Sequence, residues 1–366
     1  MPETKIYTLS GGIMNSSYKK EDVIFLLKDV TGMVEPLASE KREKLIQSGM
    51  HYSEMLPIEY IPSKEYMNIY FDSLRIFGQS VADAIGTLAD KVIEKRGKNI
   101  VLVSLARAGT PIGILLKRYI KWKYNIELSH YSISIIRDRG IDDNAMKYIL
   151  AHHNAKDILF VDGWIGKGAI LKELKKAATN YKGVSPELAV VCDPAGETTL
   201  AGTYNDIFIP SSALNATVCG LVSRTFLRSD IIGESDFHGA IYYREYESLD
   251  LSCQFIDAIQ KLFRIYTDNT KLQKTRGIQT RGIIEVQKQA KKFCIEDINL
   301  IKPGIGETTR VLLRRVPWKV LIDERYRDDK ELRHIIKLAK EKNSEIEYTE
   351  LNNYKCMGII KKMKDI

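Results

Sequence analysis

The sequence ILFVDGWIGKGA, residues 158–169, decides the fold class of this 366-residue chain. Four apolar residues are followed by an acid, Asp162, and then by a glycine-rich loop that leads into a helical stretch. Glycines let backbone N–H groups turn inward, and a helix N-terminus adds positive potential, so such a loop suits a phosphate. Neither GxxxxGK[ST] nor GxGxxG is present. The segment therefore indicates a phosphate site of another kind, or a plain strand–loop–helix turn.

Apolar strands alternate with helical stretches around this segment. A long helix is expected from Ser63 to about Arg96, with Gly97 as its stop signal. The expected strands are 100–105, 129–136, 157–161 and 188–192, and the expected helices between them are 111–123, 142–152 and 167–178. Continuous apolar strands alternating with helices predict right-handed βαβ units around a buried parallel sheet, an α/β fold.

The composition is that of a globular protein, with 44% hydrophobic and 28% charged residues. The length suggests two or three domains. No apolar run reaches the roughly 18 residues that a membrane span needs, and no secretory signal is visible, so we expect a cytoplasmic protein without a membrane partner. Five scattered cysteines without a CxxC pair fit a reducing compartment and argue against a disulfide framework or a structural zinc site.

Positive charge is concentrated near the C-terminus. Residues 1–260 hold 30 Lys and Arg against 32 Asp and Glu, whereas residues 261–366 hold 25 against 15, a net charge of +10. A basic C-terminal part beside a near-neutral larger part predicts an appended binder of polyanions. A lysine-rich surface without a specific partner is the alternative, since net charge says little about specific partners.

A second loop, in the sequence VLVSLARAGTP of residues 101–111, also ends a strand and opens a helix. It places Arg107 among the small residues Ala108, Gly109 and Thr110. Two such loops on parallel strands would face one crevice, one suited to a 5′-phosphate and the other to a pyrophosphate.

This pair of loops resembles the type I phosphoribosyltransferases in order and spacing. The resemblance implies phosphoribosyl pyrophosphate as ligand, with Mg²⁺ bridging its pyrophosphate and ribose oxygens, and displacement of pyrophosphate by a nucleophile at ribose C1. It implies catalytic roles for Asp162 and Arg107 and a ligand cradle made of Gly163, Gly166, Lys167, Gly168, Ala169, Ala108, Gly109 and Thr110. Gly163 stands where the family usually has a second acid, which leaves a non-catalytic nucleotide sensor as an alternative.

Six further stretches resemble the StiP family, found with bacterial tellurium-resistance and stress operons: 51–57, 137–142, 161–164, 192–196, 221–225 and 236–239. The family carries two labels, phosphoribosyltransferase-like and cysteine protease. Under the first, Arg137 and Arg139 at a strand end pair with pyrophosphate, or form a solvated surface pair. Asp193 orients the accepting base or closes a turn, and Ser223 and Arg224 contact phosphate or lie on a helix surface.

The protease label requires an activated thiolate. Cys219 and Cys192 are the candidate nucleophiles, with His238 or His51 as base. The alternative interpretation is that each cysteine is a small, buried apolar residue without a catalytic role. Asp142 and Asp143 are interpreted as helix-capping residues, and His152-His153 as a helix end rather than a metal pair, because adjacent residues on a helix do not face one another.

The sequence IKPGIGETTR, residues 301–310, predicts a helix that starts at about Gly306, with Arg310 and Arg314 on one face. The stretch resembles the kink-turn-binding fold of pelota and ribosomal-type RNA binders, in which a glycine, an Asn-Glu pair and a basic residue precede an apolar strand. Gly304, Gly306, Glu307 and Arg310 hold those positions, with Gly306 in place of the asparagine. Structured RNA is the implied partner, held through Arg310 and Arg314.

The expected organisation has four parts. Residues 1–62 form an N-terminal hood, 63–262 a phosphoribosyltransferase-like domain, 263–282 a basic linker and 283–366 a small α/β/α pelota-like domain with strands near 298–301, 318–323 and 346–348. No metal site made by the protein's own side chains is expected, and a homo-oligomer is left open.

Overall fold

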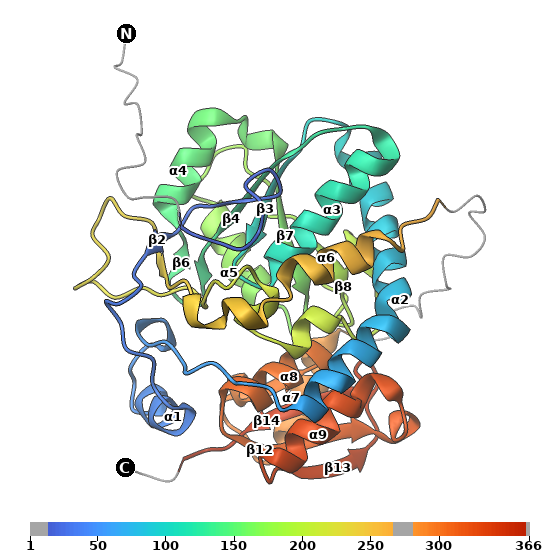
Figure 1. Cartoon of the computed structure of the whole chain (residues 1–366). Helices are drawn as coiled ribbons and strands as arrows, with labels where there is room; N and C mark the ends of the chain where they lie inside the picture. The colour runs from blue at the N-terminus through green and yellow to red at the C-terminus, as the bar shows by residue number, and fades with distance from the viewer. Residues whose placement is uncertain (1–13, 266–280, 364–366) are drawn as a thin grey trace.

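The computed structural model describes residues 14–265 and 281–363, so most of the expected linker lies outside the described residues. Its main sheet has six strands, all parallel, which confirms the expected α/β class (Figure 1). In spatial order they are β1 (Ile24–Phe25), β4 (Ser129–Ile133), β3 (Val101–Leu105), β7 (Ile158–Trp164), β8 (Leu188–Cys192) and β9 (Ala201–Thr203).

Helices cover both faces of this sheet, as buried parallel strands require. One apolar cluster joins the strands to α2 (Lys64–Arg96), α3 (Gly109–Tyr124) and α6 (Ser252–Gln260). The other joins them to α4 (Asp143–His152) and α5 (Ala169–Ala178). The start and stop signals of α2 are confirmed: the Ser63 hydroxyl accepts a hydrogen bond from the Tyr66 N–H at 3.2 Å, and Gly97 caps the C-terminus.

The single strand expected over 129–136 is wrong, because the chain leaves the sheet at Ser134. β5 (Ile135–Ile136) then pairs antiparallel with β6 (Gly140–Ile141) as a separate hairpin. The turn between them needs positive φ values, which Asp138 (67°) and Gly140 (84°) supply. The N-terminal segment contributes α1 (Ser39–Gln47), the edge strand β1, and β2 (Lys28–Asp29), which pairs with β10 (Gly239–Ala240).

The C-terminal module is a second, four-stranded sheet with helices on both faces. Its strands, in spatial order, are β11 (Ile301–Pro303), β14 (Cys356–Ile360), β12 (Pro317–Asp323) and β13 (Glu345–Thr349). Its helices are α7 (Gly282–Lys292), α8 (Ile305–Arg314) and α9 (Arg333–Glu341). The expected strand at 298–301 begins only at Ile301, because a 3₁₀ turn occupies residues 298–300, and β14 was not expected.

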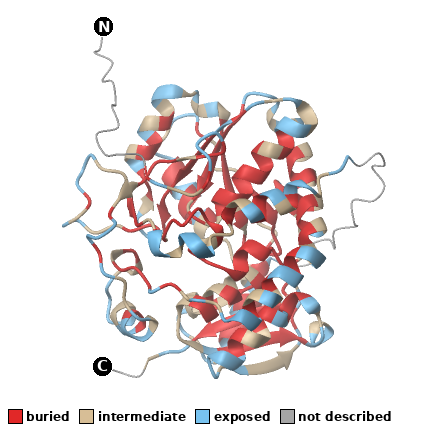
Figure 2. Ribbon diagram, viewed as in Figure 1, coloured by how far each residue is buried: buried red, intermediate tan, exposed pale blue. Residues whose placement is uncertain are grey.

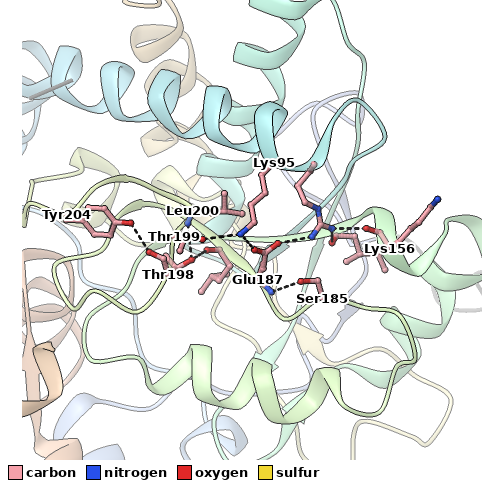
Figure 3. A network of polar contacts seen from close by, with 11 residues as sticks. Lys95, Lys156, Ser185, Glu187, Thr198, Thr199, Leu200 and Tyr204 are labelled. Atoms are coloured by element: carbon pink, nitrogen blue, oxygen red, sulfur yellow. Dashed lines mark hydrogen bonds and ion pairs between the residues drawn. The ribbon is translucent and has the colours of Figure 1, made fainter. Parts of the chain in front are cut away.

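The 33-residue helix α2 connects the two sheets; at 1.5 Å per residue it is about 50 Å long. It contacts β8 and β9 of the main sheet and α9 of the module (Figure 1). Near its C-terminal end, Arg96 pairs with Glu187 at 2.9 Å and donates to the Ile158 carbonyl at 2.6 Å, while Lys95 also pairs with Glu187 (Figure 3). These contacts fix the end of α2 beside the starts of β7 and β8.

Buried side chains run without a break from the main sheet into the module (Figure 2). A single apolar cluster contains Phe208 and Ile209 of the first part together with Ile305, Leu312 and Leu338 of the module. The module is therefore packed as part of one body. Within residues 14–265 and 281–363, no helix combines the length and the apolar character that a membrane crossing demands.

Candidate functional site

The two loops singled out in the sequence lie against each other at the carboxyl edge of the main sheet. The chain runs from β3 to β4 on one side and then returns to β7 on the other, so the switch in strand order falls between β3 and β7. Ligands of open α/β sheets bind at such a point. A Cβ on Gly109 would stand 2.4 Å from the Val161 carbonyl oxygen, so only glycine permits this contact.

The start of α8 lies directly over these loops. A Cβ on Gly306 would come within 2.2 Å of the Trp164 indole, and the Arg310 guanidinium carbon lies 4.3 Å from the centre of a Trp164 ring. The Trp164 Nε1–H donates to Glu307 Oε1 at 3.2 Å. The residues expected to bind phosphate and those expected to bind RNA therefore form one site.

Other contacts join the glycine-rich loop to the module. The Tyr354 hydroxyl donates to the Gly166 carbonyl at 2.7 Å. The Lys167 ammonium donates to the carbonyls of Ile301, at 2.9 Å, and Ile298. Burial and the nearby charge of Lys302 lower the pKa of Lys167 to about 7. Lys167 thus points at the module, and its expected place in a phosphate cradle is not supported by these contacts.

Gly168 and Ala169 complete this loop. Gly168 has a φ of 83°, and a Cβ added there would lie 3.3 Å from the Glu197 side chain. Ala169 begins α5. Gly163 lies beside the other loop, where an added Cβ would be 3.6 Å from the Ala108 carbonyl oxygen.

The region between the sheet edge and α8, here called the recess, holds a small hollow lined by Arg107, Arg310 and Arg314, and further charged side chains that interact electrostatically with these arginines. Apart from the buried Arg107, its charged residues are neither fully buried nor fully exposed: Asp162, Arg224, Lys302, Glu307, Arg310 and Arg314. Burial and the charges of neighbouring arginines together lower the pKa of Lys302 to about 8 and the pKa of Arg224 to about 9. Burial and the charges of Arg107 and Arg310 hold the pKa of Arg314 well below its ordinary value. The carboxylates of Glu307 and Glu59 offset part of the repulsion among these cations.

Asp162 is the acid near the carboxyl end of β7. Its Oδ1 accepts a hydrogen bond from the Gly163 N–H at 2.7 Å. Burial raises its pKa to about 6, against the opposing effect of Arg310. Asp162 as a residue is neither fully buried nor fully exposed.

Arg107 lies behind the recess and is almost wholly buried. It pairs with Glu59 at 2.8 Å, both side chains being 3% exposed, and donates to the Val222 carbonyl at 2.7 Å. Its Nε has no hydrogen-bond partner, and the same is true of the buried Ser212 hydroxyl. Both side chains line a hollow with room for about one water molecule, together with Trp164, Cys219, Arg310 and Arg314.

Three side chains that the sequence placed at the ligand are instead used by the fold. The Thr110 hydroxyl bonds the Ser132 hydroxyl at 2.8 Å inside the sheet. Asp193 accepts from the N–H groups of Gly196, Glu197 and Thr198, so the turn interpretation agrees with its contacts. Ser223 is not on a helix: its hydroxyl accepts from the Ile241 N–H at 3.0 Å and donates to the Arg224 carbonyl.

Arg137 and Arg139 lie on the β5–β6 turn, at the edge of the recess. Arg137 pairs with Asp138 at 3.0 Å, and Arg139 pairs with Glu54. Tyr52 lies between two guanidinium groups, with Arg224 at 4.6 Å and Arg137 at 5.5 Å from its ring centre. The hood segment therefore reaches the recess through Tyr52 and Glu54.

The two candidate thiols, Cys192 and Cys219, are both buried. Burial raises the pKa of Cys219, against the effect of Arg107, and raises that of Cys192 further. His238 Nδ1 bonds the Ser134 hydroxyl at 2.8 Å, and His51 bonds Ser53 and the Arg137 carbonyl. Within the described ranges, no hydrogen bond joins a cysteine to a histidine.

Asp142 is the N-cap residue of α4, as expected, whereas Asp143 pairs with Lys147 and accepts a hydrogen bond from the Tyr181 hydroxyl at 2.9 Å. Asp142 accepts from the N–H groups of Ala145 and His238. His152 and His153 bond to different partners, the Tyr148 carbonyl and the Tyr131 hydroxyl. In the part of the chain that the structure describes, no group of three or more His, Cys, Asp or Glu is placed to hold a metal ion.

Sequence reasoning missed Lys302 and Ser212 as recess residues and missed the docking of α8. The glycines at 166 and 306 were a signal for close approach: a Cβ on Gly166 would lie 2.9 Å from the Glu307 side chain. Glycine alone, however, does not say which segment approaches.

Comparison with known proteins gives two family matches. Residues 16–260 match a family described as tellurite-like stress resistance cysteine protease StiP. Residues 280–362 match the PELOTA RNA binding domain. A protein of Acinetobacter baylyi (strain ATCC 33305 / BD413 / ADP1) named cysteine protease StiP is 36% identical over 345 residues, which is 89% of each protein.

Two of the solved structures that match this chain have low sequence identity to it. A hypoxanthine-guanine phosphoribosyltransferase from Bacillus anthracis matches with a TM-score of 0.24 and 18% identity, over 32% of this chain and 68% of that one. A hypoxanthine-guanine-xanthine phosphoribosyltransferase matches with a TM-score of 0.23 and 14% identity, over 46% and 93%. Agreement at this level decides neither fold family nor activity.

Proposed function

The chain belongs to the StiP family, and we propose that its recess binds a ribose phosphate carrying a diphosphate, phosphoribosyl pyrophosphate or a nucleotide, and displaces pyrophosphate. One observation carries the proposal: the electrostatically coupled cations Arg107, Arg310 and Arg314 lie beside the switch point of the parallel sheet, and Arg310 acts on Asp162. A neutral or cationic substrate would leave the remainder of their repulsion uncompensated.

The acidic and the basic residues have different roles in this reaction. Asp162 accepts hydrogen bonds from ribose hydroxyls at the end of β7. Arg107, through its unpartnered Nε, and the half-buried Arg224 face the phosphate oxygens. When the bond between ribose C1 and the pyrophosphate oxygen breaks, both electrons leave with pyrophosphate, and the incoming nucleophile bonds to C1. Fixed cations stabilise the negative charge that develops on the departing pyrophosphate, and the positioning of the two reactants provides the remaining rate acceleration.

In this proposal, Mg²⁺ would bind together with the ligand. The Asp162 carboxylate offers an oxygen donor near the carboxyl end of β7, and Glu307 is already paired with Arg310 at 2.6 Å. These donors fit an ion that keeps most of its oxygens from the ligand and from water. Its contribution would be to neutralise charge on the diphosphate.

The test uses the full chain with phosphoribosyl pyrophosphate and Mg²⁺. Calorimetry measures binding, and a coupled assay measures pyrophosphate release with candidate nitrogen nucleophiles. Binding with release supports the enzyme. Binding without release with every acceptor tried supports the nucleotide sensor that Gly163 left open. Absence of binding rejects the assignment of the recess.

A second candidate function is cysteine proteolysis, which the relative's name states for that protein. The observation in its favour is that Cys219 lines the same hollow as Arg107 and Arg314, whose charges act to lower its pKa. Labelling of one thiol by an electrophile, together with loss of peptide cleavage in Cys219→Ala, would establish it.

RNA is proposed as a partner of the C-terminal module. The support is the match of residues 280–362 to an RNA binding domain and the net charge of +10 over residues 261–366. Fluorescence anisotropy of the full chain with kinked and duplex RNA tests this part, and binding must weaken as salt rises because counterions are released.

A further inference from the structure

The start of α8 is inside the protein. Gly304, Gly306 and Glu307 are the positions through which this helix was expected to meet RNA. Trp164 fills the space over Gly306, and the Gly166 backbone lies against Glu307. An RNA backbone therefore has no room at this helix start while the module is docked.

The docking is extensive, which makes the inward orientation a fixed property. Asp206 accepts from the N–H groups of Ile305, at 3.0 Å, and Lys355, at 2.9 Å. Phe208 stacks on His334 with ring centres 4.1 Å apart. Ile305 and Leu312 belong to the main apolar cluster, and separating the halves would return that apolar surface to water at about 25 cal/mol per Å².

Arg310 and Arg314 follow on the same face of α8, so they also point into the first domain. Both line the same hollow as Arg107 and Ser212, each of which has a buried polar atom without a hydrogen-bond partner, the Arg107 Nε and the Ser212 hydroxyl. Each arginine has a partner within the protein. Arg314 Nε donates to the Asn215 side chain at 2.6 Å, and Arg310 pairs with Glu307. Three guanidinium groups and a buried hydroxyl without a hydrogen-bond partner therefore surround one small hollow. Guanidinium groups are the side chains best suited to phosphate oxygens, and a diphosphate would enter here only as these long side chains move apart and the Glu307 carboxylate gives up Arg310.

We propose that Arg310 and Arg314 of α8 hold the diphosphate of the recess ligand, so that the helix serves the first domain's site and not RNA. This rests on the proposed function, which it extends by assigning the diphosphate to the module. Guanidinium groups suit the task because each offers two parallel N–H donors to phosphate oxygens. Any RNA bound by the module must then use another face.

The experiment compares the full-length protein with Arg310→Ala, Arg310→Gln and Arg333→Ala. Arg310→Gln keeps a side chain over Trp164, and Arg333 is an exposed arginine on α9 that serves as the matched control. Calorimetry with inorganic pyrophosphate and anisotropy with kinked RNA are run on each variant, and circular dichroism checks the fold.

We expect both Arg310 variants to bind pyrophosphate about ten- to a hundredfold more weakly, with RNA affinity and its salt dependence unchanged, and Arg333→Ala to bind pyrophosphate normally. Wild-type binding that survives both Arg310 variants overturns the assignment of α8 and leaves the proposed function standing. A loss of RNA affinity without a loss of pyrophosphate affinity also overturns the assignment of α8 and shows that this helix binds RNA. If the wild type binds neither pyrophosphate nor phosphoribosyl pyrophosphate, both proposals fall.

Discussion

Asp206 accepts a hydrogen bond from the Ile305 N–H at 3.0 Å, so a side chain of the first domain pairs with the first N–H group of α8. The carboxylate is 5% exposed, and burial raises its pKa to about 7 although backbone donors act in the opposite direction. The folded protein thus holds a proton here more tightly than the unfolded chain does.

The first prediction concerns stability against pH. Because the folded pKa of Asp206 exceeds the unfolded value, its contribution to the free energy of unfolding is full below about pH 4 and is lost as the pH rises through about 7. The slope is at most about 1.4 kcal/mol per pH unit. Urea denaturation at several pH values should show a flatter dependence in Asp206→Asn than in wild type. The exposed Asp328→Asn is the control, and equal slopes in all three proteins would contradict the assignment.

The second prediction is that Asp162→Asn weakens phosphoribosyl pyrophosphate binding by about 1.5–3 kcal/mol, the usual value of a charged hydrogen bond. Calorimetry with Mg²⁺ present measures it. Asp328→Asn should bind as the wild type does. An unchanged affinity in Asp162→Asn would remove the ribose role.

The third prediction concerns Lys302, whose pKa is lowered to about 8 by burial and by the charges of Arg137 and Arg315. As the pH rises from about 7 to 9 this ammonium loses its proton, so the affinity for pyrophosphate should fall. In Lys302→Met the affinity should be lower at pH 7 and should fall less. The ligand's own titration is the same for both proteins and for the exposed control Lys330→Met, so parallel curves for Lys302→Met and wild type would count against Lys302.

The fourth prediction is that the thiols are dispensable for ligand binding. Burial raises the pKa of Cys219 and Cys192, which keeps both sulfurs protonated near neutral pH. A folded variant with all five cysteines changed to Ser or Ala should bind phosphoribosyl pyrophosphate with unchanged affinity. Loss of a proteolytic activity on changing one cysteine, with the fold intact, would favour the protease instead.

The fifth prediction uses Trp164 as a reporter. Its indole touches Arg310 and Glu307, so displacement of that guanidinium by an anion should change its fluorescence. Pyrophosphate should alter the emission of wild type and of Trp122→Phe but not of Trp164→Phe. A signal that persists without Trp164 would place the ligand elsewhere.

The features that could be predicted from the sequence are those that depend on residues close to one another in the chain. The apolar run before Asp162, the Ser63 cap and the Gly97 stop lie within a few positions of the features they determine. β1 and β9, with two and three residues, are too short to carry a periodic pattern. Their pairing depends on strands far away in the chain.

The site was harder to predict because its parts meet only in three dimensions. Trp164 and Glu307 are distant in sequence, and their contact depends on the shared apolar cluster that orients the module. The roles of Thr110 and Asp193 could not be chosen from the sequence, because a polar side chain at a strand end serves a ligand or its own fold equally well. Ser132 and the 196–198 amides decided the matter here.

The apolar cluster shared by the two domains has a consequence for work with fragments. A C-terminal piece cut away near residue 281 would expose Ile305 and Leu312 together with the cationic face of α8, surfaces that the intact chain encloses. Such a piece would tend to self-associate and to attract any polyanion through newly uncovered arginines. Nucleic-acid binding by the excised module would then report on a surface that the whole protein never presents.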